Sequence, residues 1–306
     1  MSRRELRLGT RGSALALVQA RLAAEALEHA GETVRIVVIQ TAGDRRVPDT
    51  AWGEGAFVVA IERALIAGVV DIAVHSAKDI PTGGDGRLVI GAYLHRADPR
   101  DALVLAQGRS ERGVDDLPAS ARVGTDSPRR TGFLRARRPD LRIHPLHGNV
   151  DTRLRRLDDG ESDALVVACA GIDRLGRRDR IAARLEPDVV PPAPGQGAIA
   201  VQALTGDERT LAAIAAIDDA ATHQAVQVER TFLAATGGGC RAPVGALATV
   251  DGGLVSLLAG SVEPDGSDAR IERRQAPLEA SGRLAVEMAS ELGHRGGGTM
   301  TTADPT

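Results

Sequence analysis

Hydrophobic and polar positions follow two rhythms in the first third of the chain. β-branched runs such as Thr33–Gln40 and Val70–His75 are typical of buried strands, and Ser13–Ala30 carries apolar residues at helical spacing. Strands and helices that alternate in this way predict an open, mostly parallel α/β sheet. The expected strands are Glu5–Leu8, Thr33–Gln40, Val70–His75 and Leu88–Tyr93, with helices at Ser13–Ala30 and Phe57–Ala67 and a glycine-containing loop over 41–55.

A second alternating set begins after Asp98–Asp101 and is similar in architecture to the first. The proline-rich stretch Pro187–Pro194 is interpreted as a hinge, after which the strand Ala198–Ala203 is a candidate to return to the first sheet. The expected strands of the second set are Leu103–Leu105, Arg122–Gly124, Leu141–Leu146 and Ala164–Cys169, with helices that begin at Pro128 and Val150.

The pattern changes again after Gly237–Gly239. Two apolar runs flank Asp251–Gly253, which indicates a β-hairpin. The expected elements of this last part are a helix over Asp218–Ala235, strands at Val244–Val250, Leu254–Ser261 and near Arg270–Arg274, and a helix near Leu278–Leu292.

These patterns together predict an α/β fold class with a smaller α+β part at the C-terminus. The predicted domains are residues 1–97 with 196–216 returning, residues 98–195, and residues 217–292. The glycine- and threonine-rich tail over 293–306 is expected to be disordered.

The composition narrows the class of protein. The 306 residues are 43% hydrophobic and 26% charged, which suits a large buried core. A net charge of −3 gives no reason to expect a nucleic-acid or membrane partner. No apolar run approaches the ~20 residues of a membrane helix, and no signal-peptide pattern follows the early arginines. We therefore expect a cytoplasmic protein.

Lys78 stands apart because it is the single lysine among 38 basic residues. Lysine is a rotatable point charge, whereas arginine is a planar fork. The position of Lys78, directly before Asp79 and just after the strand Val70–His75, indicates a local functional need, although chance also accounts for one lysine. Asp79 is either a cap or turn residue, or a carboxylate that faces developing positive charge.

Three strand-to-helix turns combine arginine with hydroxyl or amide side chains: Thr10–Ser13, Thr125–Arg130 and Gly148–Arg153. Helix N-termini suit anions, and in α/β sheets ligands bind at the carboxyl ends of strands. In the second turn, Ser127 is a good N-cap, yet Arg129 and Arg130 follow in the first helical turn and oppose the helix dipole. A bound anion would remove this conflict; a solvated basic helix face is the alternative.

The absence of a phosphate-loop motif favours carboxylate as the anion, because arginine binds carboxylates in a bidentate manner. The seven histidines show no metal-ligand spacing, so we assign no metal site. Cys169 lies in an apolar stretch and is expected to be a buried structural residue. Cys240 follows three glycines and precedes Arg241, so it is either a nucleophile or attachment point, or an inert loop cysteine.

Seven segments together resemble the porphobilinogen deaminase (hydroxymethylbilane synthase) family over roughly residues 4–292. They are LGTRGSALALVQA, VDIAVHSAKDIP, RADPRDALV, VGTDSPRR, HGNVDTRLRRLDDGESDALVVACAGIDRLG, PAPGQGAIAVQ and GGGCRAPVGA. The resemblance implies an enzyme of porphyrin and haem biosynthesis. It would condense four porphobilinogen molecules head to tail, with loss of ammonia, into the linear tetrapyrrole hydroxymethylbilane. The implied fold has three domains, and the first two resemble periplasmic binding proteins.

The resemblance also implies roles for single residues. Cys240 would carry a dipyrromethane cofactor through a thioether, and Asp79 would contact pyrrole N–H groups and stabilise a cationic azafulvene-like intermediate. The implied cofactor-binding residues are Lys78, Ser127, Arg129 and Arg130, and the implied substrate-binding residues are Arg11, Ser13, Thr125, Arg153 and Arg174. A monomer is expected, with porphobilinogen as the substrate.

Three positions differ from the residues usual in that family. His147 stands in place of an arginine, Asp126 in place of a small neutral residue, and Glu54 in place of a lysine, so the cleft is expected to be less positive. This leaves two alternatives open. One is a divergent paralogue that binds carboxylates or pyrroles with weak or no deaminase activity. The other is a solute-binding protein, against which the third domain argues.

Overall fold

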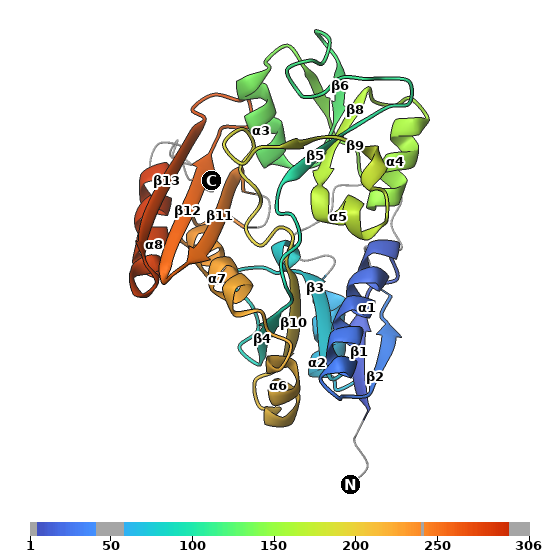
Figure 1. The fold of residues 1–306 in the computed structure, drawn as a ribbon, viewed down its shortest axis with the longest axis vertical. Coiled ribbons are helices and arrows are strands. Elements are labelled where there is room, and N and C mark those ends of the chain that lie inside the picture. The colour runs from blue at the N-terminus through green and yellow to red at the C-terminus, as the bar shows by residue number, and fades with distance from the viewer. Residues whose placement is uncertain (1–4, 41–57, 240–241, 294–306) are drawn as a thin grey trace, which may run out of the picture.

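The computed structural model describes residues 5–40, 58–239 and 242–293, and Figure 1 shows them as three sheets with their covering helices. The first sheet has the order β2-β1-β3-β10-β4. It is built from β1 (Leu6–Thr10), α1 (Ala14–His29), β2 (Val34–Val38), α2 (Val59–Ile66), β3 (Ile72–Ser76), the 3-10 turn η2 (Ala77–Asp79), β4 (Leu88–Tyr93), β10 (Ile199–Leu204) and α6 (Glu208–Ala215).

Helices cover both faces of this sheet because alternate residues of each strand point to opposite faces. Ile72 and Val74 pack with Leu27 of α1, whereas Ala73 packs with Leu65 of α2. The carboxyl ends of β1 and β3 are thereby held at one edge, close to the second sheet.

The second sheet has the order β7-β6-β8-β5-β9. Phe133 of α3 lies in a core on one face, and Leu154 of α4 lies in a core on the other. Its elements are β5 (Asp101–Leu105), β6 (Arg122–Gly124), α3 (Pro128–Arg137), β7 (Arg142–His144), α4 (Val150–Asp158), β8 (Ala164–Ala168), α5 (Cys169–Arg174), η3 (Arg178–Arg180) and β9 (Ile181–Leu185).

The third sheet is antiparallel, in the order β11-β12-β13. Phe232 of α7 and Met288 of α8 pack in one core with Leu257 of the central strand. The elements are α7 (Ala220–Ala235), β11 (Val244–Asp251), β12 (Leu254–Ser261), β13 (Arg270–Pro277), η4 (Leu278–Ala280) and α8 (Ser281–Gly293).

The α/β class with a smaller third sheet is confirmed. In each five-stranded sheet four strands run in one direction, as predicted for a mostly parallel sheet, and one strand runs in the other. β10 runs antiparallel to β3 and β4, and β5 runs antiparallel to β8 and β9. The reason is topological: β10 returns from the second sheet in the reverse direction and inserts between β3 and β4. The exact domain boundaries stay a prediction.

The sequence also misplaced or missed some elements. The strand expected to end at Cys169 ends at Ala168, and Cys169 begins α5. The pattern did not predict α5, α6 or β9, although Asp207 accepts a hydrogen bond from Thr210 N and caps α6, a signal that the sequence contains. The predicted loop over 41–55, Glu54 and most of the tail lie outside the described residues.

Candidate functional site

The turn that follows β3 brings the predicted polar residues to the sheet edge. β3 ends at Ser76, and Lys78 and Asp79 lie in η2 directly after it. Gly195 packs against this turn with φ +75°, and a Cβ there would lie 3.1 Å from the Ala77 Cβ. Glycine is therefore required at 195, because an L side chain disfavours this backbone conformation and would press on the turn.

Two small cavities flank the hydrogen-bonded pair of Gln19 and Ser76, whose Nε2 and Oγ atoms lie 2.8 Å apart. Asp79 lines the smaller cavity of about 30 Å³, together with Arg11. The larger cavity is about 90 Å³, and its basic lining residues are Lys78, Arg130, Arg153 and Arg174. No acidic residue among the described ones lines the larger cavity, so it favours an anion.

Burial weakens the basicity of these cations without removing it at neutral pH. Burial and the neighbouring Arg130 lower the pKa of Lys78 to about 8, and the Lys78 Nζ donates to Gln196 Oε1 at 3.1 Å. Burial lowers the pKa of Arg153 and of Arg174 to about 10 each. A bound carboxylate would stabilise the charged form of all three.

Arg129 and Arg130 are both anchored by a carboxylate that sequence reasoning missed. Asp101 is fully buried and accepts from Arg129 at 2.9 Å and from Arg130 at 2.7 Å. Although burial opposes it, these two guanidinium groups hold the pKa of Asp101 well below its usual range. Arg129 also donates to Pro191 O at 2.6 Å and lines neither cavity. Its predicted role in cofactor binding stays a prediction with a competing structural explanation.

Arg130 is different because it reaches the larger cavity. Its Nη1 donates to Val166 O at 3.2 Å, and its Nε is buried without a hydrogen-bond partner in the part of the chain that the structure describes. Gln196, which is fully buried, links this region to the start of β5 and the residue pair before it: its Nε2 donates to Pro99 O and to Asp101 Oδ1, each at 2.8 Å. The sequence analysis quoted Gln196 within a motif but gave it no role.

Three further predicted ligand residues, Ser13, Ser127 and Thr125, accept hydrogen bonds from backbone N–H groups close to them in the sequence. Ser13 and Ser127 cap α1 and α3 by accepting from Ala16 N at 3.3 Å and from Arg130 N at 3.4 Å. Thr125 is buried and accepts from Ser127 N at 3.4 Å. Helix capping thus accounts for these hydroxyls, and their predicted role as ligands is untested.

Arg11 and Arg174 connect the first sheet with the second. Arg11 Nη2 donates to Asn149 Oδ1 at 3.4 Å, and Arg174 Nη2 donates to Gly197 O at 2.7 Å. Two of the three unusual positions also meet: His147 Nδ1 lies 2.5 Å from Asp126 Oδ2. The three arginine turns therefore lie close together, around the two small cavities.

Of the two cysteines, Cys169 lies within the described residues and Cys240 does not. Cys169 is buried, as predicted, and burial raises the pKa of its thiol to about 12, which disfavours the reactive thiolate. Gly239, at the end of the described segment, follows the glycines after α7.

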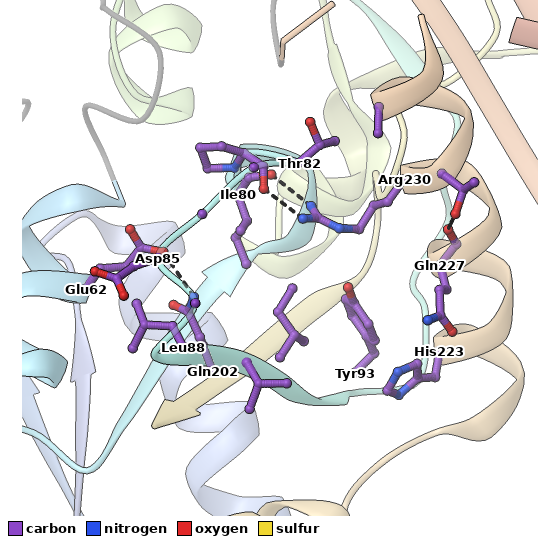
Figure 2. A pocket seen from close by; sticks show the side chains of 18 residues that line it. Glu62, Ile80, Thr82, Asp85, Leu88, Tyr93, Gln202, His223, Gln227 and Arg230 are labelled. Carbon is purple, nitrogen blue, oxygen red and sulfur yellow. Dashed lines mark hydrogen bonds between the residues drawn. The ribbon is translucent and has the colours of Figure 1, made fainter. Parts of the chain in front are cut away.

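A third cavity, of about 490 Å³, lies apart from the arginine turns, between α7 and the segment after Asp79. Figure 2 shows Arg230 reaching from α7 to this segment, where it donates to Ile80 O at 2.8 Å and Pro81 O at 2.7 Å. Its lining is mixed, with acidic Glu62 and Asp85 beside Tyr93. The lining of this third cavity therefore differs from that of the cavity beside Lys78, whose described lining residues include four cations and no acidic side chain.

In the described ranges, no helix is long and apolar enough to span a membrane. Within the same ranges, no cluster of three or more His, Cys, Asp or Glu residues could hold a metal ion.

Comparison with known proteins gives full-length matches. The family model "Porphobilinogen deaminase, dipyromethane cofactor binding domain" matches residues 6–212, and "Porphobilinogen deaminase, C-terminal domain" matches residues 223–300. The porphobilinogen deaminase of Roseiflexus castenholzii is 47% identical over 96% of this chain and 98% of its own length. That of Mycobacterium leprae is 46% identical over 94% and 91%.

Among solved structures, similarity is weaker. A periplasmic substrate-binding protein of an ABC transporter from Coxiella burnetii aligns with 71% of this chain and 94% of its own, at a TM-score of 0.43 and 15% identity.

Proposed function

The chain belongs to the porphobilinogen deaminase family, and we propose on this basis that it is a hydroxymethylbilane synthase. It condenses four porphobilinogen molecules head to tail into a linear tetrapyrrole and releases ammonia. The structural observation that supports this most strongly is the acid-free cavity lined by Lys78, Arg130, Arg153 and Arg174, next to the cavity that Asp79 lines. A cytoplasmic location and a monomeric state stay predictions.

The described residues fit a dipyrromethane cofactor in charge. Such a group bears acetate and propionate arms, and the cavity of about 90 Å³ beside Lys78 offers four cations and, among its described lining residues, no competing carboxylate. The Arg130 Nε is a buried donor that has no partner among the described residues, and a carboxylate could accept its hydrogen bond. When bound, the cofactor supplies the pyrrole end from which the chain grows. We propose Cys240 as its attachment point.

Each residue of the site then has a distinct task. Lys78, Arg153 and Arg174 bind and orient carboxylate arms, since charge-assisted hydrogen bonds to arginine and lysine are strong and directional. Asp79 presents a carboxylate to the pyrrole N–H and stabilises the positive charge that develops as the amine leaves as ammonia. Because this stabilisation is aimed at the transition state rather than at the bound substrate, it acts on kcat.

His75 is excluded as the proton donor by its environment. It is 4% exposed, and burial lowers its pKa to about 4, so the imidazole is neutral at physiological pH. Its Nε2 is buried without a hydrogen-bond partner among the described residues. We therefore assign it to the core of the first sheet rather than to the chemistry.

The test is ammonia release from porphobilinogen by the purified full-length chain and by Asp79→Asn. We expect turnover by the unaltered protein and a fall in kcat of about 10²- to 10³-fold in the variant, the typical effect of removing one group that stabilises transition-state charge. The matched control is Asp85→Asn, which removes an exposed carboxylate six positions along the chain and should leave kcat unchanged. No release by the unaltered protein would refute the function, and full activity of Asp79→Asn would refute its role.

A further inference from the structure

One carboxylate lies among the arginine turns that are proposed to bind carboxylates. Asp126 occupies the turn between β6 and α3, and its side chain is 13% exposed. A charge of this sign in this position repels carboxylate ligands. Unless the surrounding residues neutralise Asp126, it opposes the proposed function.

The structure gives Asp126 two basic neighbours. His147 Nδ1 donates to Asp126 Oδ2 at 2.5 Å, and the Arg153 Nη2 lies 3.8 Å from the same oxygen. The two side chains of the Asp126–His147 pair are similarly shielded, at 13% and 14% exposure. Within the described part of the chain, the carboxylate therefore sits between His147, which is close, and Arg153, which is at the limit of an ion pair.

Arg153 is held away from a full ion pair by its own backbone contact. Its Nε donates to Gly148 O at 2.8 Å, in the turn that also carries His147. Arg156 Nη1 donates to His147 O at 3.3 Å and fixes the same turn. The Arg153 guanidinium thus keeps N–H donors available for the cavity that Arg153 lines together with Lys78.

We propose that the hydrogen bond from His147 holds the Asp126 carboxylate, and that the pair positions Arg153 and leaves its charge free for a carboxylate of the ligand. This inference rests on the proposed function of Arg153. His147 and Asp126 are positioning residues in this account, because they act on the ligand through Arg153. Without His147, the carboxylate has one basic neighbour left and draws the Arg153 guanidinium into an ion pair of its own.

The proposal predicts that the effect of His147 depends on Asp126. His147→Gln should raise the KM for porphobilinogen about tenfold, with a much smaller change in kcat, because binding rather than chemistry is impaired. Asp126→Asn should leave KM equal or lower. The double variant should match Asp126→Asn, since no carboxylate is left to compete for Arg153. His147→Lys, which keeps a hydrogen-bond donor beside Asp126, should stay within about threefold of the unaltered protein.

The experiment measures KM and kcat from ammonia release in these proteins, with melting temperatures to verify folding. The control is His95→Gln, which removes an exposed histidine 3.2 Å from Asp219 and should change neither constant. If the unaltered chain releases no ammonia, the function fails independently, and equilibrium dialysis of porphobilinogen then supplies dissociation constants for the same comparison. A tenfold rise in KM caused by His147→Gln that persists in the Asp126→Asn background would overturn the proposal. An unchanged KM for His147→Gln in both backgrounds would overturn it as well.

Discussion

Burial and neighbouring charges set the properties of individual residues in this site. Lys78 is the clearest case, because burial and, after it, the neighbouring Arg130 lower its pKa to about 8. Sequence reasoning singled Lys78 out from composition alone, but it could not give this pKa. The shift depends on Arg130, which comes from the second sheet, 52 positions away along the chain.

The pKa of Lys78 predicts how binding depends on pH. The amine is charged below about pH 8 and neutral above it, so carboxylate binding should weaken as pH rises through that value. We expect the KM for porphobilinogen to rise over this range. Lys78→Arg keeps its charge to much higher pH and should lose this rise, even if its KM at neutral pH is altered. An identical pH profile of KM in both proteins would show that another group titrates.

At the scale of elements, the ion pairs of Asp101 join β5 to α3. The carboxylate and both guanidinium groups are at most 5% exposed. Asp101→Asn leaves two buried cations without their counter-ion, which typically costs about 3–5 kcal/mol of unfolding free energy. Denaturant titration measures this loss. Asp115→Asn, which breaks an exposed pair with Arg137, is the control and should have little effect. Equal stability of both variants would contradict this account of β5 and α3.

The elements also show how far the sequence leads. The order of strands and helices along the chain followed from periodicity, and Leu88–Tyr93 was predicted to the residue. The direction of β10 was not, because strand orientation depends on where the chain re-enters a sheet and not on side-chain period. Short elements such as α5 were missed for a similar reason: six residues are too few to show helical spacing.

For the candidate site, too, the sequence predicted some features and missed others. The three arginine turns and Asp79 were found from residue type and position after strands, and the structure places them around the two small cavities. The partners of Arg129 could not be found, because Asp101 and Pro191 are distant in sequence and meet it through tertiary packing. Likewise, the pairing of Asp126 with His147 turns two apparently unfavourable residues into one compensated unit.

At the scale of the whole molecule, one buried residue ties the third sheet to the segments that flank β4 and β10 of the first sheet. Glu229 of α7 is fully buried and binds Arg96, next to the first sheet, through two hydrogen bonds of 2.6 and 3.0 Å. It also accepts from Gly195 N at 2.7 Å and from Ala248 N of β11 at 2.8 Å. Helix α7 is therefore anchored to Gly195, before β10, and to the segment directly after Asp79, where Arg230 also binds (Figure 2).

This architecture supports the central claim, which is that one chain carries its own dipyrromethane and extends it beside Asp79. The claim requires the cofactor to be covalent and to depend on Cys240. Intact-protein mass spectrometry of the full-length chain, before and after incubation with porphobilinogen, tests it directly. Incubation with porphobilinogen distinguishes a protein that received too little cofactor during expression from a protein that cannot attach it.

We predict a mass excess equal to two linked pyrrole units in the unaltered protein and none in Cys240→Ser. Cys169 is the internal control, because its buried, high-pKa thiol should not react. An unmodified mass after incubation, or an excess that survives in Cys240→Ser, would contradict the account.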